Sequence, residues 1–223
     1  MNSPWRCVLI FCLGLLPGKA VHAACDFDDF PVLDEMVVAS IADQLQWNNQ
    51  PMNVKAFSLD GPLSAVTSFY TNKWQGAVDV TRFGKWQQVL HISEACLMLV
   101  QVQAHQDKSI GRLMLVNPPV EALAGRVLGS GVPMPPDAVV VSDMQSDDGG
   151  REGQLVMLAS TESLEDNLRW YQSEMLRGGW HANHQTQQQN DATLIYSKGR
   201  KQFSVVLLRH QGFTQILLNR MEH

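Results

Sequence analysis

The stretch Leu155–Gly178, LVMLASTESLEDNLRWYQSEMLRG, predicts a strand that is followed directly by an amphipathic helix. Four large side chains share one face of this helix at the spacing i, i+4, i+7 and i+11: Leu164, Leu168, Tyr171 and Met175. Thr161 is the expected N-cap, and Gly178 ends the helix. The stripe on one face indicates that the helix covers a sheet.

The same pattern occurs a second time, about 100 residues upstream. Val54–Ser58 (VKAFS) aligns with Leu155–Ala159 (LVMLA), and Phe69–Tyr70 aligns with Trp170–Tyr171, both at an offset of 101. A constant offset through a strand and a helix is the signature of an internal repeat. The chain therefore predicts two related units.

Each unit has a predicted strand order of β-β-α-β-β-β. Three strands with alternating apolar residues are expected after each helix: 87–92, 96–103 and 110–116, then 192–197, 202–208 and 213–218. The predicted fold class is α+β, with two tandem units, each an antiparallel sheet covered by one helix. The expected first unit is 25–117, the linker 118–131 and the second unit 132–223. The arrangement resembles helix-grip folds.

The first 24 residues have the features of a cleavable signal peptide. Arg6 supplies the positive n-region, Cys7–Leu16 the apolar h-region, and Val21–Ala23 the cleavage motif. We therefore expect a periplasmic or secreted protein whose mature chain begins at Ala24 or Cys25. Lipid anchoring at Cys25 is the less favoured alternative, because His22 stands where lipidation motifs have an aliphatic residue. No later stretch reaches the roughly 20 apolar residues of a membrane-spanning helix, so no transmembrane segment is expected after signal removal.

Signal removal leaves two cysteines, Cys25 and Cys96. Two thiols in an oxidising compartment pair most simply with each other, so we predict a Cys25–Cys96 disulfide with a structural role.

Composition and charge exclude several classes of protein. The 223 residues are 45% hydrophobic and 17% charged, which is typical of a globular chain. Arg6 and Lys19 leave with the signal, so the basic count falls from 17 to 15 against 22 acidic residues, a net charge of −7. Because no basic stripe is present, nucleic acid is not an expected partner.

The sequence contains no complete catalytic or metal-binding motif. His181 and His184 form a close pair, but the helix has already ended at Gly178–Gly179, Gln185–Asn190 is expected to be a loop, and no third ligand is fixed nearby. Asp26–Asp29 and Asp147–Gly150 lack the spacing of a calcium loop, and the second is better explained as a strand-connecting turn. We therefore expect no metal, no cofactor and no enzymatic activity, with a hydrolase lacking a recognisable motif as the third alternative.

Aromatic residues and sheet edges suggest protein binding. Trp47, Trp86 and Trp180 fall near predicted turns or strand ends, where exposed aromatics suit a binding surface. The strands that contain Leu115 and Leu217 are the predicted free edges for pairing with a partner. The leading hypothesis is an exported, non-enzymatic binding or assembly-accessory protein that contacts another envelope protein. The alternative is a carrier of a small apolar ligand, held in a cavity between helix and sheet.

Overall fold

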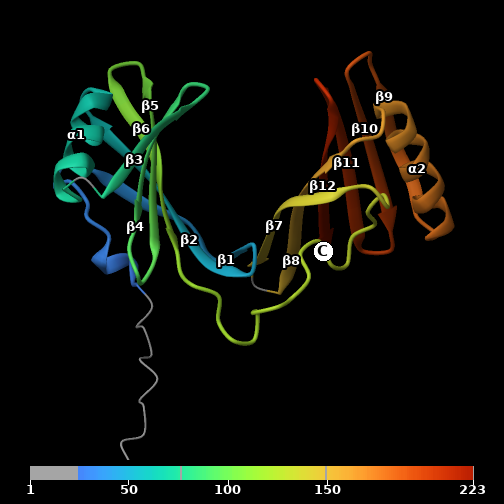
Figure 1. Ribbon diagram of the computed structural model, residues 1–223, viewed down its shortest axis with the longest axis horizontal. Helices are drawn as coiled ribbons and strands as arrows, with labels where there is room; N and C mark the ends of the chain where they lie inside the picture. The colour runs from blue at the N-terminus through green and yellow to red at the C-terminus, as the bar shows by residue number, and fades with distance from the viewer. Residues whose placement is uncertain (1–24, 76, 149, 223) are drawn as a thin grey trace, which may run out of the picture.

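The computed structural model describes residues 25–222 except 76 and 149, and it shows an α+β fold (Figure 1). Within these residues, twelve strands form one continuous antiparallel sheet, in the order β3-β4-β5-β6-β2-β1-β7-β8-β12-β11-β10-β9. The first half contains η1 (Phe27–Asp29), β1 (Val37–Trp47), β2 (Gln50–Asp60), α1 (Leu63–Lys73), β3 (Val78–Phe83), β4 (Trp86–Ile92), β5 (Leu97–His105) and β6 (Lys108–Val116). The second contains β7 (Val139–Asp148), β8 (Arg151–Ser160), α2 (Leu164–Arg177), β9 (His181–Gln187), β10 (Asp191–Lys198), β11 (Lys201–His210) and β12 (Phe213–Glu222).

The two halves repeat the same order of elements, as the sequence predicted, but each has one strand more than expected. The additional strands, β3 and β9, directly follow the helices and form the two outer edges of the sheet. All seven residues of β9 are exposed, and β3 is almost as open. An edge strand that is exposed on both faces needs no apolar alternation: β9 has none, and β3 has it only at Val78 and Val80, which is too short a run to identify a strand in the sequence. The loop expected at Gln185–Asn190 is therefore wrong for residues 185–187, which belong to β9.

The expectation of two separate sheets is also wrong, because β1 pairs with β7. Leu45 lies opposite Ser146 and Trp47 opposite Met144. The β1–β2 turn strengthens this junction: the Asn48 backbone N–H donates to the Asp143 carbonyl at 2.8 Å, and the Asp143 N–H donates to Asn48 Oδ1 at 2.8 Å. The halves are thus parts of one backbone hydrogen-bonded sheet.

Asp143 also anchors the segment that connects the halves. Its side chain is buried and accepts hydrogen bonds from the Gly129 N–H at 2.7 Å and from Gln154 Nε2 at 3.2 Å. A buried carboxylate is tolerated only when donors satisfy it, so these contacts fix the connection over the junction.

Each helix packs on one face of its half of the sheet. The predicted stripe on α2 is confirmed, since Leu164, Leu168, Tyr171 and Met175 are all buried in one core. In both halves the helix tyrosine donates to a proline carbonyl of the segment that enters the first strand: Tyr70 to Pro31 at 2.8 Å and Tyr171 to Pro133 at 3.2 Å. Burial raises the pKa of both tyrosines. The neutral hydroxyl therefore serves as a fixed donor.

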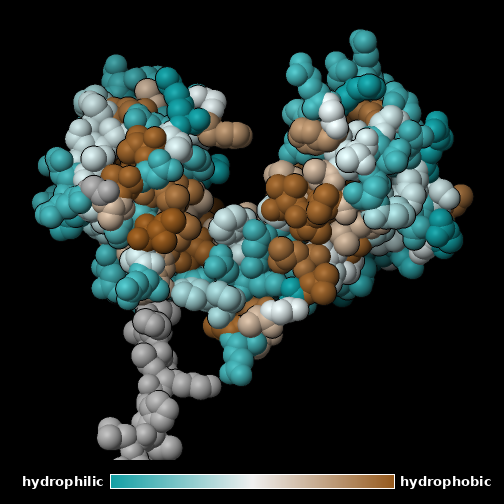
Figure 2. Space-filling view, viewed as in Figure 1, coloured by the Kyte–Doolittle hydropathy of each residue, from teal (hydrophilic) through white to brown (hydrophobic). Residues whose placement is uncertain are grey.

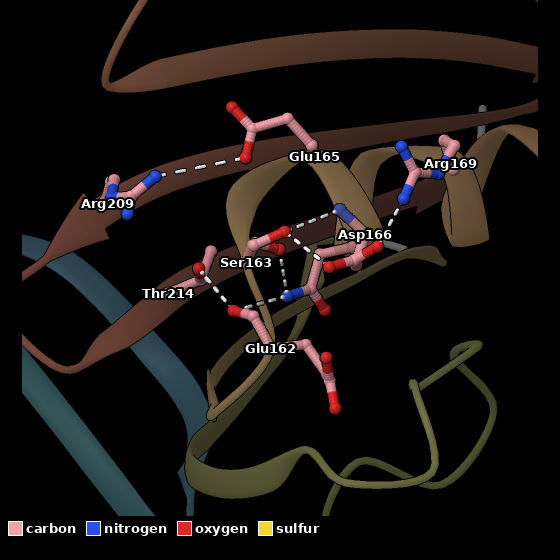
Figure 3. Close-up of polar contacts among 8 residues, drawn as sticks. Glu162, Ser163, Glu165, Asp166, Arg169, Arg209 and Thr214 are labelled. Atoms are coloured by element: carbon pink, nitrogen blue, oxygen red, sulfur yellow. Dashed lines mark hydrogen bonds and ion pairs between the residues drawn. The ribbon is translucent and has the colours of Figure 1, made fainter.

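The N-cap of α2 is Ser163 and not Thr161. Ser163 Oγ accepts the Asp166 backbone N–H at 3.0 Å (Figure 3). Asn167 Nδ2 donates to the Glu162 and Ser163 carbonyls, and Thr214 of β12 donates to the Glu162 carbonyl at 2.9 Å. This network ties the start of the helix to the sheet.

The halves form two lobes with the helices on their outer sides and the sheet between them (Figure 1). The junction strands β1, β2, β7 and β8 join the lobes at one end, and an open space separates the lobes at the other (Figure 2). The sheet thus has a helix-covered face and an open, concave face.

We predict that Gly111→Ala in β6 lowers the free energy of unfolding by about 3 kcal/mol, measured by urea denaturation. A Cβ at Gly111 would lie 2.1 Å from the Gln101 carbonyl oxygen and 2.4 Å from the Phe57 ring. The control is Gly153→Ala, whose Cβ meets only the movable Ser146 side chain, nearest at 2.6 Å, and is expected to cost at most about 1 kcal/mol. Equal losses would show that close packing between β2, β5 and β6 is not the constraint.

Candidate functional site

The open face of the first half is apolar. Successive residues of a strand point to opposite faces, and Met98, Val100, Leu113 and Leu115 pack in the core beneath α1. Their neighbours on the same strands consequently point away from the helix, to the open face: Leu97, Leu99, Met114 and Val116. Both strands carry the tetrapeptide LMLV, at 97–100 and at 113–116, so both faces are apolar.

These side chains line a groove of about 340 Å³. Eight of its lining residues are apolar: Trp47, Met52, Leu90, Leu97, Leu99, Met114, Val116 and Met144. All seven strands from β1 to β7 contribute to the lining, so the junction between the halves is part of the site. An antiparallel sheet with one face in water usually has polar residues on that face, and this groove departs from that rule.

The apolar surface continues into the second half. Met144 lies opposite Trp47 on one side and opposite Leu155 on the other. On the next row, Met157 lies opposite Leu217, which lies opposite Val206. These second-half residues are partly exposed, and Figure 2 shows hydrophobic side chains on both lobes beside the open space. A continuous apolar patch of this kind is typical of a surface that contacts a ligand, a membrane or another protein.

A polar row borders the groove in the first half. Strand pairing aligns Thr81, Gln88, Gln101 and Arg112 across β3, β4, β5 and β6, and Thr81 Oγ1 donates to Gln88 Oε1 at 3.2 Å. Arg112 is exposed, and its guanidinium carbon lies 5.5 Å from the centre of the Trp86 ring. The groove thus has an apolar floor and a border with one cation stacked against an aromatic ring.

A larger groove, of about 590 Å³, lies on the other face of the junction, beside the segment that connects the halves. Its lining is mixed, with Arg126, Arg220, Asp147 and Glu152 among polar amides. Charges of both signs there favour no single class of ligand, so the apolar groove is the stronger candidate site.

The three predicted tryptophans have different environments. Trp47 lines the groove, and Trp86 stacks with Arg112 at its border. Trp180 packs beside α2, where its ring centre lies 5.7 Å from that of Phe203, so it belongs to the helix-side core. Partner binding by these residues stays a prediction.

The predicted free edges at Leu115 and Leu217 are wrong. Leu115 is in β6, between β5 and β2, and its side chain is fully buried; Leu217 is in β12, between β8 and β11. The sequence shows the order of the strands along the chain but not their order in the sheet. In the sheet, the last strand of each half pairs with the second strand of that half, β6 with β2 and β12 with β8, and is therefore interior. Leu217 instead contributes to the apolar open face.

The groove residues of β4, β5 and β6 were not predicted as a site. The signal was present, because the two LMLV runs have apolar residues at consecutive positions, and one helix can cover only one face of such strands. Apolar alternation identifies the residues of the helix-side core and leaves the opposite face of the same strands unassigned.

The candidate metal ligands of the sequence do not come together in a metal site among the described residues. His181 and His184 lie on the exposed edge strand β9, and the described part of the chain has no group of three or more His, Cys, Asp or Glu side chains arranged to hold a metal ion. Gly150, with φ +87°, donates its N–H to Asp147 Oδ1 at 2.8 Å, which confirms a strand-connecting turn.

No helix among the described residues is long and apolar enough to cross a membrane. The predicted signal peptide, 1–24, lies outside the described residues.

A family model described as START domain-like matches residues 140–212. The match runs from β7 through α2 to β11 and covers less than half of the chain, so it is a likeness of the second half. No curated protein and no solved structure matches the chain.

The disulfide between Cys25 and Cys96 is confirmed, and it closes a sequence separation of 71 residues. It fixes the N-terminal arm at the start of β5. The arm is held further by Asn117, whose Oδ1 accepts the Cys25 N–H at 2.9 Å and whose Nδ2 donates to the Cys25 carbonyl at 3.1 Å.

We predict that the double variant Cys25→Ser/Cys96→Ser loses about 4 kcal/mol of unfolding free energy, since the bridge restricts the unfolded chain. Urea denaturation measures the loss. Reductant should destabilise the wild-type protein to the same extent and leave the double variant unchanged. A loss below about 1 kcal/mol would contradict a role for the bridge in stability.

Proposed function

We propose that this chain is a binding protein for an apolar small molecule, which lies in the groove on the open face of the sheet. The observation that carries the proposal is the apolar lining of that groove on a face that no helix covers. Its volume of about 340 Å³ is within the range of small-molecule sites, about 300–1,000 Å³.

Physical chemistry favours apolar binding at this surface. Removing apolar surface from water contributes about 25 cal/mol per Å², and each leucine or methionine covered by a ligand adds to that term. Three methionines, Met52, Met114 and Met144, line the groove. Flexible, polarisable thioethers adapt to ligands of varied shape.

The ligand position differs from the one expected from the sequence, which was beneath the helix. That space is occupied in the second half, where Leu164, Tyr171 and Met175 are at most 1% exposed. The likeness of residues 140–212 to START domain-like proteins is in line with ligand binding as the general role. A predicted signal peptide and a disulfide support an exported, periplasmic or secreted carrier without catalytic activity.

The assembly role through sheet edges has weaker support. The free edges are β3 and β9. Apart from Ala182, the exposed side chains of β9 are polar, as in edge strands that avoid pairing, whereas β3 exposes Val80 and Phe83. An apolar groove with a defined volume is more specific evidence than two exposed side chains on one edge strand.

We expect Leu99→Gln to weaken binding of a neutral fluorescent probe, N-phenyl-1-naphthylamine, about tenfold, because burial of one leucine contributes about 1.5–3 kcal/mol. Fluorescence titration of mature protein measures the affinity. The matched control is Leu176→Gln on α2, an exposed leucine outside the groove, which should leave the affinity unchanged. Wild-type protein that does not bind the probe, or two variants that bind it equally, would contradict the proposal.

A further inference from the structure

The polar border of the groove contains one cation that has no carboxylate partner. The ion pairs found in the described residues do not include Arg112. Lys108, on the same face of β6, is already paired with Asp60 at 2.8 Å. Arg112 is therefore the cation at the groove that can accept an anionic group of a ligand.

Arg112 is placed next to the apolar floor. It is two residues from Met114 on the same strand face, a step of about 7 Å. The Trp86 ring on one side of the guanidinium restrains it, and its planar N–H groups can donate to a carboxylate in a bidentate manner. Gln101, opposite Arg112 on β5, adds an amide to this border.

The local charge outweighs the acidic character of the whole chain. Asp79 shares the open face, but it lies on β3, three strands from β6 and in the row of Met114, which places it about 16 Å from Arg112. That distance exceeds the screening length of about 8 Å at physiological ionic strength. An anion beside Arg112 therefore interacts mainly with Arg112.

The groove volume limits the apolar part of the ligand. About 340 Å³ is near the lower end for small-molecule sites, which suits one unbranched chain and leaves no room for a pair of chains side by side. The floor follows the rows of side chains across neighbouring strands, from Leu90 and Leu99 to Met144. An extended chain fits this shape.

We infer that the ligand is a single-chain fatty carboxylate, with its chain on the Leu/Met floor and its carboxylate on Arg112. This inference rests on the proposed function and adds the headgroup and the orientation. The chain supplies affinity by apolar burial, and the arginine distinguishes a carboxylate from a neutral group of the same chain length.

Competition at pH 7.5 between the bound neutral probe and two ligands, dodecanoate and dodecan-1-ol, tests the inference. Wild-type protein should bind dodecanoate about tenfold more tightly than the alcohol, because a hydrogen-bonded charge contributes that much. Arg112→Gln should remove the preference while keeping the affinity for the alcohol. Arg112→Lys should retain part of the preference, since it keeps the charge.

The control is Arg82→Gln, which changes the net charge equally on a side chain directed to the helix side of β3. It should keep the wild-type preference. Equal binding of both ligands by the wild type, or a preference that survives Arg112→Gln, would overturn the carboxylate site and leave apolar binding intact. Failure of both ligands to displace the probe would overturn the fatty-carboxylate assignment, and failure of the probe itself to bind would overturn the proposed function as well.

Discussion

A helix can cover only one face of a sheet, and the rest of this structure follows from that constraint. Each half has one long helix and strands that are apolar on both faces, such as the LMLV runs at 97–100 and 113–116. The helix takes one set of side chains into a core. The other set stays on the open face, where its exposure to water costs free energy unless something covers it.

The junction between β1 and β7 determines how the two open faces relate. Pairing of Trp47 with Met144 makes the faces continuous, and the Asn48–Asp143 hydrogen bonds fix the turn that makes this possible. The Asp143 carboxylate also holds Gly129 and Gln154, so this one buried residue links the turn through its backbone, and the connecting segment and β8 through its side chain. The groove uses residues from both halves because of this junction.

Local patterns in the sequence predicted the local structure well. The stripe from Leu164 to Met175 follows from the spacing of apolar residues within one helix, and the repeat follows from a constant offset between similar segments. The Cys25–Cys96 pair follows because only two cysteines remain after signal removal. The order of strands in the sheet was not predictable from such local patterns.

Leu115 and Leu217 looked like edge residues in chain order, yet β6 and β12 are interior, because pairing between distant strands depends on tertiary packing. The exposed strand β9 has no apolar alternation to reveal it, and β3 has only the short alternation of Val78 and Val80. Prediction of the groove requires both the order of strands in the sheet and the positions of the helices, because only these show which of the two apolar faces is left uncovered.

The most direct test of the account is to locate the ligand relative to the two faces of the sheet. Isotope-filtered NOEs between unlabelled dodecanoate and ¹³C-methyl methionine report which methionines touch the chain. We expect contacts to Met52, Met114 and Met144 on the open face, and none to Met98 and Met175 in the helix-side cores. Contacts to Met98 or Met175 in place of the groove methionines would put the ligand between helix and sheet and contradict the account.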